Sequence, residues 1–295
     1  MSFSKISEIL TIAQEKKLPF WEVILDDDMQ ERNVSREDSF CRMEKLLDAM
    51  ILADKNYNPV LKSQSGMSGG DGAKLEAFRK QDNRLIGTFL ATVMEKAVKM
   101  AESNACMGRI VAAPTAGSCG VIPAVLLTYM EEKQVEKSKI VEALYVSAGI
   151  GQVIAMTASI SGAEGGCQAE IGSASAMAAG AVTYLEGGSS EQIANAAALA
   201  LKNMLGLTCD PVAGLVEVPC IKRNVSGAVN AIVSSQMSMA GVVSAIPADE
   251  VFESMGRIGE LLPSCLKETS TEGLAVCPTA QKFTARQTSF LPGGR

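Results

Sequence analysis

The chain of 295 residues is 47% hydrophobic but only 4% aromatic, and such small apolar side chains favour an all-α fold of closely packed helices over sandwiches or barrels. Its 27 basic and 33 acidic residues give a net charge of -6, and no basic stretch carries interleaved aromatics, which argues against nucleic acid as a partner. Histidine is absent, which excludes Ser-His and Cys-His catalytic pairs and histidine-containing zinc sites within this chain.

The first sixty residues predict helices with clear starts and stops. Pro19 can open a helix over 20–33, and Ser35 with Asp38 resembles a capping pair in front of a helical pattern over 39–57. The N-terminus lacks the basic start and the unbroken apolar stretch of a signal peptide, and eight cysteines in a chain without a leader suggest a reducing compartment. We therefore expect a cytoplasmic protein.

A glycine-rich loop over 63–74 separates these helices from a series of further helical patterns. The most apolar pattern, over 140–162, is interrupted by Glu142 and Gln152, so a buried core helix explains it better than a membrane span. The remaining patterns cover 84–105, 121–132, 168–185, 190–206, 228–245 and 248–263.

Period-two strand patterns are scarce along the chain, and no repeat of fixed length occurs. Ser190 is the predicted N-cap of the helix over 190–206. We expect a single large helical domain with glycine-rich loops between helices, in which residues 1–60 form an N-terminal segment and 61–295 carry the chemistry.

The first glycine-rich loop contains SGMSGGDGAK at 65–74, and its consecutive glycines free backbone N–H groups that can cradle an anion. It is not a Walker loop, because Lys74 is followed by Leu75 where that motif needs Ser or Thr. A plain crossing over another helix explains the glycines equally well. As a binding loop for a small carboxylate it would use Ser65, Gly66, Ser68 and Lys74.

The second special loop is PTAGSCG at 114–120, directly in front of an apolar helix. This composition is typical of an anion-binding helix N-terminus, in which Thr115 supplies a hydroxyl, Gly117 allows a close backbone approach and Pro114 leads into the turn. An ordinary N-cap explains the same residues and remains an alternative.

Three cysteines stand beside turn-forming glycine or proline and next to polar residues, unlike cysteines that fill a core. These are Cys167 in EGGCQAEIG, Cys209 in GLTCDPVAG and Cys220 in EVPCIKRN. Their spacing matches neither a zinc ribbon nor a ferredoxin run, so spacing alone would favour three unrelated structural thiols. Lys222 and Arg223 are near enough to lower thiolate pKa values, and three thiolates are one short of the set for a cubane cluster, which leaves one iron open as a Lewis acid.

Four motifs in this order resemble the alpha chain of the bacterial iron-sulfur L-serine dehydratases: SGMSGGDGAKL, MGRIVAAPTAGSCGVIPAVL, GGCQAEIGSASAMAAGA and GLTCDPVAGLVEVPCIKRN. The resemblance covers nearly the whole chain. It implies a 4Fe-4S cluster on Cys167, Cys209 and Cys220, conversion of L-serine to pyruvate and ammonia without pyridoxal phosphate, and a separate beta chain. Cys119 and Cys277 depart from the family's pattern, and Cys277 could approach the cluster as the terminal cysteine of single-chain relatives does.

The expected reaction is a β-elimination in which the open iron takes the serine hydroxyl and a base removes the α-proton. The substrate carboxylate is expected on N–H groups of one of the two loops, with Lys74 or Arg223 as countercharge. We expect Ser65 and Thr115 at the reacting centre. Lys74 can act as the base only where burial lowers its pKa, and a base from the beta chain fits equally well.

Two other functions remain open on the sequence. One is an L-cysteine desulfidase, which would release sulfide together with pyruvate. The other is a non-catalytic iron-sulfur redox sensor or carrier, in which a fourth protein thiol completes the coordination.

Overall fold

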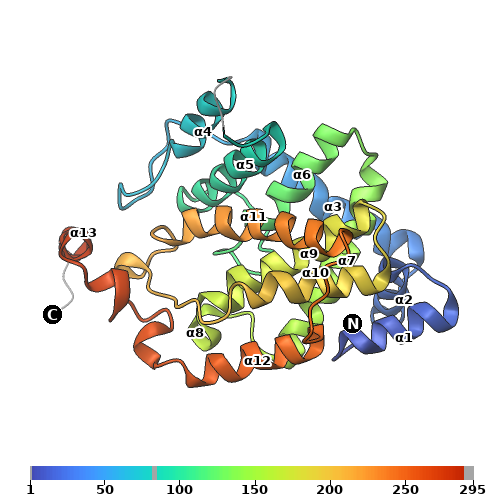
Figure 1. Ribbon diagram of the computed structural model, residues 1–295. Helices are drawn as coiled ribbons and strands as arrows, with labels where there is room; N and C mark the ends of the chain where they lie inside the picture. Colours follow the sequence, from blue (N-terminus) through green and yellow to red (C-terminus); the bar gives the residue numbers. More distant parts are fainter. Residues whose placement is uncertain (1, 82–84, 289–295) are drawn as a thin grey trace.

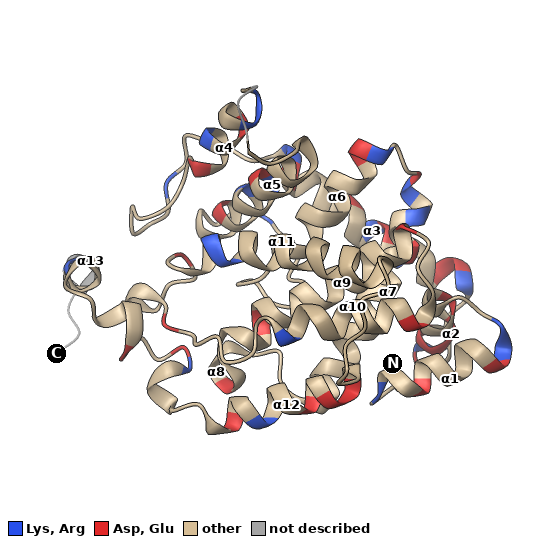
Figure 2. Cartoon of the chain, viewed as in Figure 1, with Lys and Arg blue, Asp and Glu red and all other residues tan. Residues whose placement is uncertain are grey.

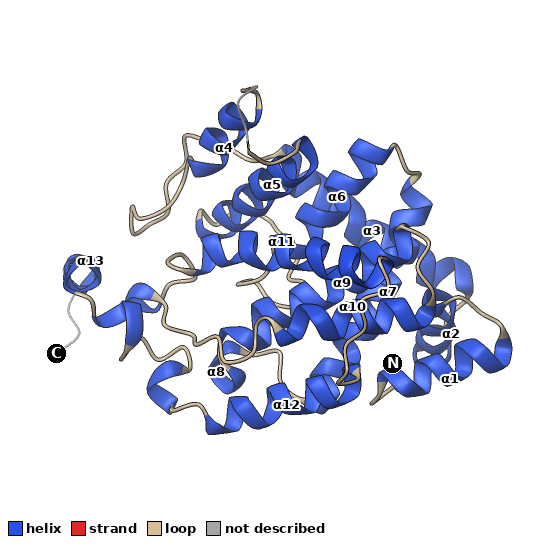
Figure 3. Ribbon diagram, in the orientation of Figure 1, coloured by secondary structure: helices blue, strands red, loops and turns tan. Residues whose placement is uncertain are grey.

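The protein is described here by a computed structural model that covers residues 2–81 and 85–288. The described residues form an all-α fold without a β-strand, which confirms the fold class expected from composition (Figures 1 and 3). The helix predicted from residue 84 begins at Thr88, and residue 84 itself lies outside the described ranges. The helices are α1 (Ile6–Lys16), α2 (Phe20–Arg32), α3 (Arg36–Lys55), α4 (Asp71–Arg79), α5 (Thr88–Ala105), α6 (Val121–Lys133), α7 (Lys137–Thr157), α8 (Gly162–Gly165), α9 (Ser173–Leu185), α10 (Ser190–Lys202), α11 (Cys220–Met239), α12 (Ala248–Leu261) and α13 (Pro278–Thr288).

Helix α9 runs through the centre of the fold and packs against α6, α7, α10 and α11 (Figure 1). Its residues 173–183 are all buried, and most of them are Ala, Ser or Gly. Small residues let neighbouring helices approach closely: a Cβ added at Gly151 of α7 would lie 2.7 Å from the Met177 methyl of α9. Figure 2 shows that the central helices carry few charged residues, whereas Lys, Arg, Asp and Glu gather on the peripheral ones. A core with few aromatic and many small side chains thus allows the helices to pack tightly where they cross.

The N-terminal helices α1 to α3 cover one side of this core. Buried side chains of all three, such as Ile9, Leu25 and Leu47, belong to the same apolar cluster as those of α7 and α9. The predicted capping pair is present, because the Ser35 hydroxyl accepts a hydrogen bond from the Asp38 amide at 3.0 Å. Since these helices share the common core, residue 60 marks no separate core.

Helix α7 is the one described helix that is long and apolar enough to cross a membrane by length and composition. In the fold it is largely buried: Tyr145, Ile150 and Ile154 lie in the core. The apolar stretch therefore serves as a central helix, as predicted from its polar interruptions.

Candidate functional site

The three cysteines singled out by the sequence lie at one end of the helix bundle, where α8 and the first turn of α11 face the same side as α4 and α13 (Figure 1). Cys167 precedes a short π-helix, Gln168–Gly172, that runs directly into α9. Cys209 lies in the segment between α10 and α11, and Cys220 is the first residue of α11. All three are buried, with 1%, 2% and 6% of their surface exposed.

The electrostatic environment of the thiols shows that they share one neighbourhood. Burial raises the pKa of Cys209, and Cys167, Glu170 and Cys220 raise it further. A Cβ added at Gly162 would lie 3.2 Å from the Cys209 sulfur and 2.9 Å from Glu170 Oε2, so the thiol and the carboxylate flank the same glycine. The structure thus brings together cysteines that are far apart in the chain.

Backbone and amide contacts hold two of the cysteines in place. Cys209 N donates to Leu266 O at 2.9 Å, and its carbonyl accepts from Glu268 N at 2.8 Å. Beside Cys167, the buried Gln168 accepts from Gly206 N at 2.8 Å through its side chain. These bonds connect the turn after Cys167 with the chain that leads to Cys209.

Arg223 lies beside the thiols, as the sequence predicts. It donates to Thr208 O at 2.7 Å and to Asp210 Oδ1 at 2.9 Å, and a hydrogen bond to Cys167 opposes the rise in that thiol's pKa. Burial nevertheless raises the pKa of Cys167 to about 11 and that of Cys220 to about 12. Arg223 thus lowers both thiol pKa values as predicted, but burial outweighs this effect and the net pKa values are raised.

Lys222 does not contribute to the thiol environment. Its ammonium group is largely exposed and pairs with Asp71 at 2.6 Å, across from α11 to α4. Of the two predicted cations, Arg223 is the one that the fold places next to sulfur.

The donor set fits an iron-sulfur cluster. Buried thiols without a disulfide partner are natural iron ligands, and the Arg223 guanidinium can offset part of the negative charge of a cluster. No group of three described Cys, Asp or Glu side chains is arranged around a single metal ion. A cluster does not require such a group, because its thiolates bind different irons and need not converge on one point.

The other two cysteines in question lie in different surroundings. Cys119 is completely buried in a small apolar cluster with Met100 and Ala53, and its thiol contacts Met100 O at 3.9 Å. Cys277 is exposed just before α13, and its thiol contacts Gly273 O at 3.9 Å. Cys119 thus fills core space, and an approach of Cys277 to the cluster remains a prediction.

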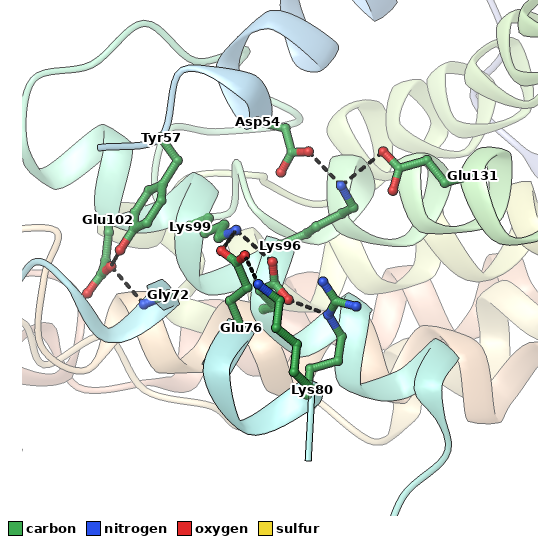
Figure 4. Close-up of polar contacts among 11 residues, drawn as sticks. Asp54, Tyr57, Gly72, Glu76, Lys80, Lys96, Lys99, Glu102 and Glu131 are labelled. Carbon is green, nitrogen blue, oxygen red and sulfur yellow. Dashed lines mark hydrogen bonds and ion pairs between the residues drawn. The ribbon is translucent and has the colours of Figure 1, made fainter. Parts of the chain in front are cut away.

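The first glycine-rich loop holds an anion, but the anion is a side chain of the protein. The Glu102 carboxylate accepts hydrogen bonds from the amides of Gly69, Asp71 and Gly72 at 2.9–3.2 Å, and from Tyr57 Oη at 2.6 Å. Figure 4 shows the bonds from Gly72 and Tyr57. The glycines therefore create the predicted cradle. Glu102 already occupies these three amides, so they are not free for a substrate carboxylate, whereas the alternative position on the second loop stays a prediction.

The serines at the start of this loop bind a second buried carboxylate. Ser63 Oγ and Ser65 Oγ donate to Glu217 Oε2 at 2.7 and 2.9 Å. The Ser68 amide donates to Ser63 Oγ at 3.2 Å, while the Ser68 hydroxyl is buried without a hydrogen-bond partner among the described residues. Gly66 turns the loop with φ +74°, a conformation that glycine adopts without strain.

Lys74 does not meet the condition for a base. Its side chain is 79% exposed and pairs with Asp71 at 2.8 Å. The hydrogen bond to Asp71 raises the pKa of Lys74 above its ordinary value. The prediction of Lys74 as a base of lowered pKa is wrong for this chain alone, because it lies on the exposed face of α4 beside an acid.

The second loop contacts the turn that follows Cys167. Thr115 Oγ1 donates to Glu170 Oε1 at 2.7 Å, and a Cβ at Gly117 would lie 3.0 Å from the same oxygen, so the loop passes close to this carboxylate. Asn224 of α11 fixes the loop, since it accepts from Gly120 N and donates to Gly117 O, both at 2.8 Å. Pro114 enters the loop through a cis peptide.

Burial raises the pKa of Glu170, and the Thr115 hydrogen bond only partly opposes this. The sequence placed Glu170 in a cysteine motif but gave it no role. The roles of Glu102 and Glu217 were missed entirely, because nothing in the sequence shows that an acid will be buried against donors from a distant loop.

Comparisons with known proteins place this arrangement in a family. The sequence model described as "Serine dehydratase alpha chain" matches residues 15–275. A "Probable L-serine dehydratase, alpha chain" of Bacillus subtilis is 44% identical over 281 residues, 95% of this chain and 94% of the relative. The "L-serine dehydratase, alpha chain" of Peptoniphilus asaccharolyticus is 40% identical over 94% of this chain and 95% of its own length. "L-serine dehydratase TdcG" of Escherichia coli is 46% identical over 61% of this chain and 40% of its own length.

Proposed function

The chain belongs to the serine dehydratase alpha chain family, and we propose that it is the catalytic alpha chain of an enzyme that converts L-serine to pyruvate and ammonia. The observation that carries this proposal is how the two glycine-rich loops meet the cysteines. Thr115 bonds to Glu170, three residues after Cys167, and Ser65 bonds to Glu217, three residues before Cys220. Both loops thus close over one thiol-lined centre.

We propose that Cys167, Cys209 and Cys220 hold a 4Fe-4S cluster. When bound with one iron free of protein thiolate, the cluster would supply a Lewis acid for the leaving hydroxyl of serine. Around it, Arg223 offsets negative charge at Cys167, and the burial of all three thiols keeps water away from the ligands. The eight free cysteines fit the reducing cytoplasm that we expect for such a site.

The α-proton of serine needs an acceptor, and this chain has no histidine to provide one. With Lys74 exposed and paired, we propose that a beta chain supplies the base. The names of the full-length relatives as alpha chains support a second kind of subunit. Within this chain, Glu170 is the carboxylate whose raised pKa best suits it to hold a proton near the thiols.

Anaerobic purification with and without a coexpressed beta chain tests the proposal. We expect iron-sulfur absorbance in both preparations and rapid pyruvate formation from L-serine only in the complex. Rapid turnover by the single chain would contradict the need for a second subunit. Sulfide release from L-cysteine in preference to serine turnover would identify a desulfidase, and a cluster that shows no spectral response to L-serine would identify a sensor or carrier.

A further inference from the structure

We propose that Glu217 binds the ammonium group of the substrate and so makes the site specific for an amino acid. This inference rests on the proposed function. It concerns a residue for which neither the sequence motifs nor the comparisons suggest a role. Four features of the structure support it: the tight turn that holds Glu217, its hydrogen bonds, its free oxygen and the potential around it.

Glu217 lies in the tight turn directly in front of α11, three residues before Cys220. Ile221 N donates to Glu217 O at 3.0 Å and closes this turn, whose Val218–Pro219 peptide is cis. The two ends of a tight turn lie close together, typically with Cα atoms less than about 7 Å apart. In L-serine the amino and hydroxyl groups sit on adjacent carbons. A substrate whose hydroxyl reaches the centre next to Cys220 must therefore carry its ammonium group close to Glu217.

The hydrogen bonds of Glu217 leave half of its carboxylate unused. Both hydroxyl donors, from Ser63 and Ser65, go to Oε2. Oε1 accepts no hydrogen bond from the described residues, and it is not among the completely enclosed polar atoms without a partner. A carboxylate that is 96% buried and has one accessible oxygen is suited to bind a cation from outside the chain.

The potential at this point suits a cation. The pKa of Cys106 is raised by burial and then by Glu102 and Glu217, which shows that both acids act on the same small region. Lys62, directly in front of the loop, partly opposes this rise in the Cys106 pKa, but its ammonium group donates to Gly69 O at 2.5 Å. No described cation pairs with Glu217, whereas Glu102 is saturated by its own donors.

The other carboxylates near the thiols are less suitable. Asp210 is paired with Arg223 and also accepts from Leu274 N at 2.9 Å. Burial and the neighbouring Glu268 raise the pKa of Glu170, which favours the neutral form and suits proton transfer more than cation binding. The buried Ser68 hydroxyl in the same loop lacks a partner, so a bound ligand would also satisfy a polar group that is otherwise left alone.

The test is Glu217→Gln in the cluster-loaded complex with the beta chain, because glutamine keeps an acceptor for the two serines and removes the charge. We expect the KM for L-serine to rise about 10- to 100-fold, as for the loss of a charged hydrogen bond, with iron content and absorbance unchanged. The inhibition constant of 3-hydroxypropanoate, which keeps the hydroxyl and carboxylate but has no amine, should stay the same. Glu164→Gln is the matched control, since it removes an equal charge three residues from Cys167 on an exposed side chain.

The possible results distinguish a failure of the ammonium site from a failure of the proposed function. The ammonium site would be overturned if Glu217→Gln kept the wild-type KM for L-serine or lost iron. It would also be overturned if L-serine and 3-hydroxypropanoate bound more weakly by the same factor, because Glu217 would then act by shaping the loop. A rise in KM of similar size in Glu164→Gln would also overturn it, since the effect would then be one of general charge. A wild-type complex that forms no pyruvate from L-serine would overturn the proposed function itself.

Discussion

The proposed iron-sulfur cluster depends on three single residues. Each of Cys167, Cys209 and Cys220 is buried without a disulfide, and loss of one thiolate from a set of three leaves the cluster poorly held. We expect substitution of any one by Ala to abolish the iron-sulfur absorbance and the activity together. Cys41→Ala is the control, because that exposed side chain lies on α3, and it should keep full iron content. Full iron in any of the three variants would remove that residue from the ligand set.

Glu102 holds the first glycine-rich loop in place, so its substitution should lower the free energy of unfolding. It is 1% exposed and accepts three amide hydrogen bonds and one from Tyr57. Glu102→Gln replaces one accepting oxygen by an amide nitrogen that faces N–H donors, so we expect a loss of about 1–3 kcal/mol in the free energy of unfolding. Urea unfolding measures this. Tyr57→Phe removes one neutral donor and should lower the free energy of unfolding by less. An equal loss in both variants would contradict the view that the amide donors contribute more than Tyr57.

The cysteines and the hydroxyls of the two loops could be predicted from the sequence, because glycine and proline around them mark unusual backbone. The buried glutamates could not, since an acid becomes a structural acceptor only through donors that tertiary contacts bring to it. Lys74 illustrates the same difficulty. As a base it would need burial, which the sequence leaves open, because its exposure and its pairing with Asp71 depend on how α4 lies on α5.

At the scale of elements, α4 is held on α5 by a layer of ion pairs (Figure 4). Glu76 pairs with Lys99 and Lys80, both at 2.8 Å, and Arg79 pairs with Glu95 at 2.5 Å. Because α4 carries the end of the first glycine-rich loop, these pairs position the loop as well as the helix.

This layer predicts a dependence of stability on pH. Lys80 and then Lys99 lower the pKa of Glu76 from 4.5 to about 2. A lowered pKa means that the stabilisation is complete above pH 4.5 and is lost as the pH falls through about 2. We expect the apoprotein to be more stable than Glu76→Gln at pH 6, and the difference between their unfolding midpoints to vanish near pH 2. The difference in stability at pH 6 should be modest because the Glu76 side chain is partly exposed. A constant difference across this pH range would show that the charge of Glu76 is not what stabilises α4.

The helix boundaries show what the apolar periodicity of the sequence can predict and what it cannot. The apolar patterns located the central helices, but the N-cap predicted at Ser190 is wrong. The N-cap is Ser189, because its Oγ accepts from Gln192 N and its backbone N donates to Gln192 Oε1. The capping box of Ser189 and Gln192 decides between two adjacent serines. The segment predicted as one helix over 168–185 begins as a π-helix, whose wider turn sets Glu170 towards Thr115.

At the scale of the whole molecule, the chain combines a rigid small-residue core with a site at one end. The helices α9, α10 and α11 supply the rigid part, and the C-terminal residues after α12 wrap the segment that contains Cys209, as Ser270 Oγ donates to Pro211 O at 2.7 Å and Leu274 N donates to Asp210. This wrapping could not be predicted from the sequence, because the residues after 261 lack strong periodicity and their contacts are with a distant loop.

That arrangement leads to a prediction about metal removal. Cys167 and Cys209 belong to a large apolar cluster that is held by many side-chain contacts, so we expect the chain to keep its helices when the proposed cluster is removed. We expect prolonged aeration with a chelator to abolish pyruvate formation and iron-sulfur absorbance while far-ultraviolet circular dichroism changes little. An iron without a protein thiolate is open to oxidants, and extraction there inactivates before the fold is affected. Iron, sulfide and a thiol reductant added anaerobically should then restore absorbance and activity in parallel, whereas Cys209→Ala treated in the same way should recover neither. Undiminished activity after aeration and chelation would count against a catalytic cluster, and collapse of the helices on chelation would show that the metal is needed for the fold itself.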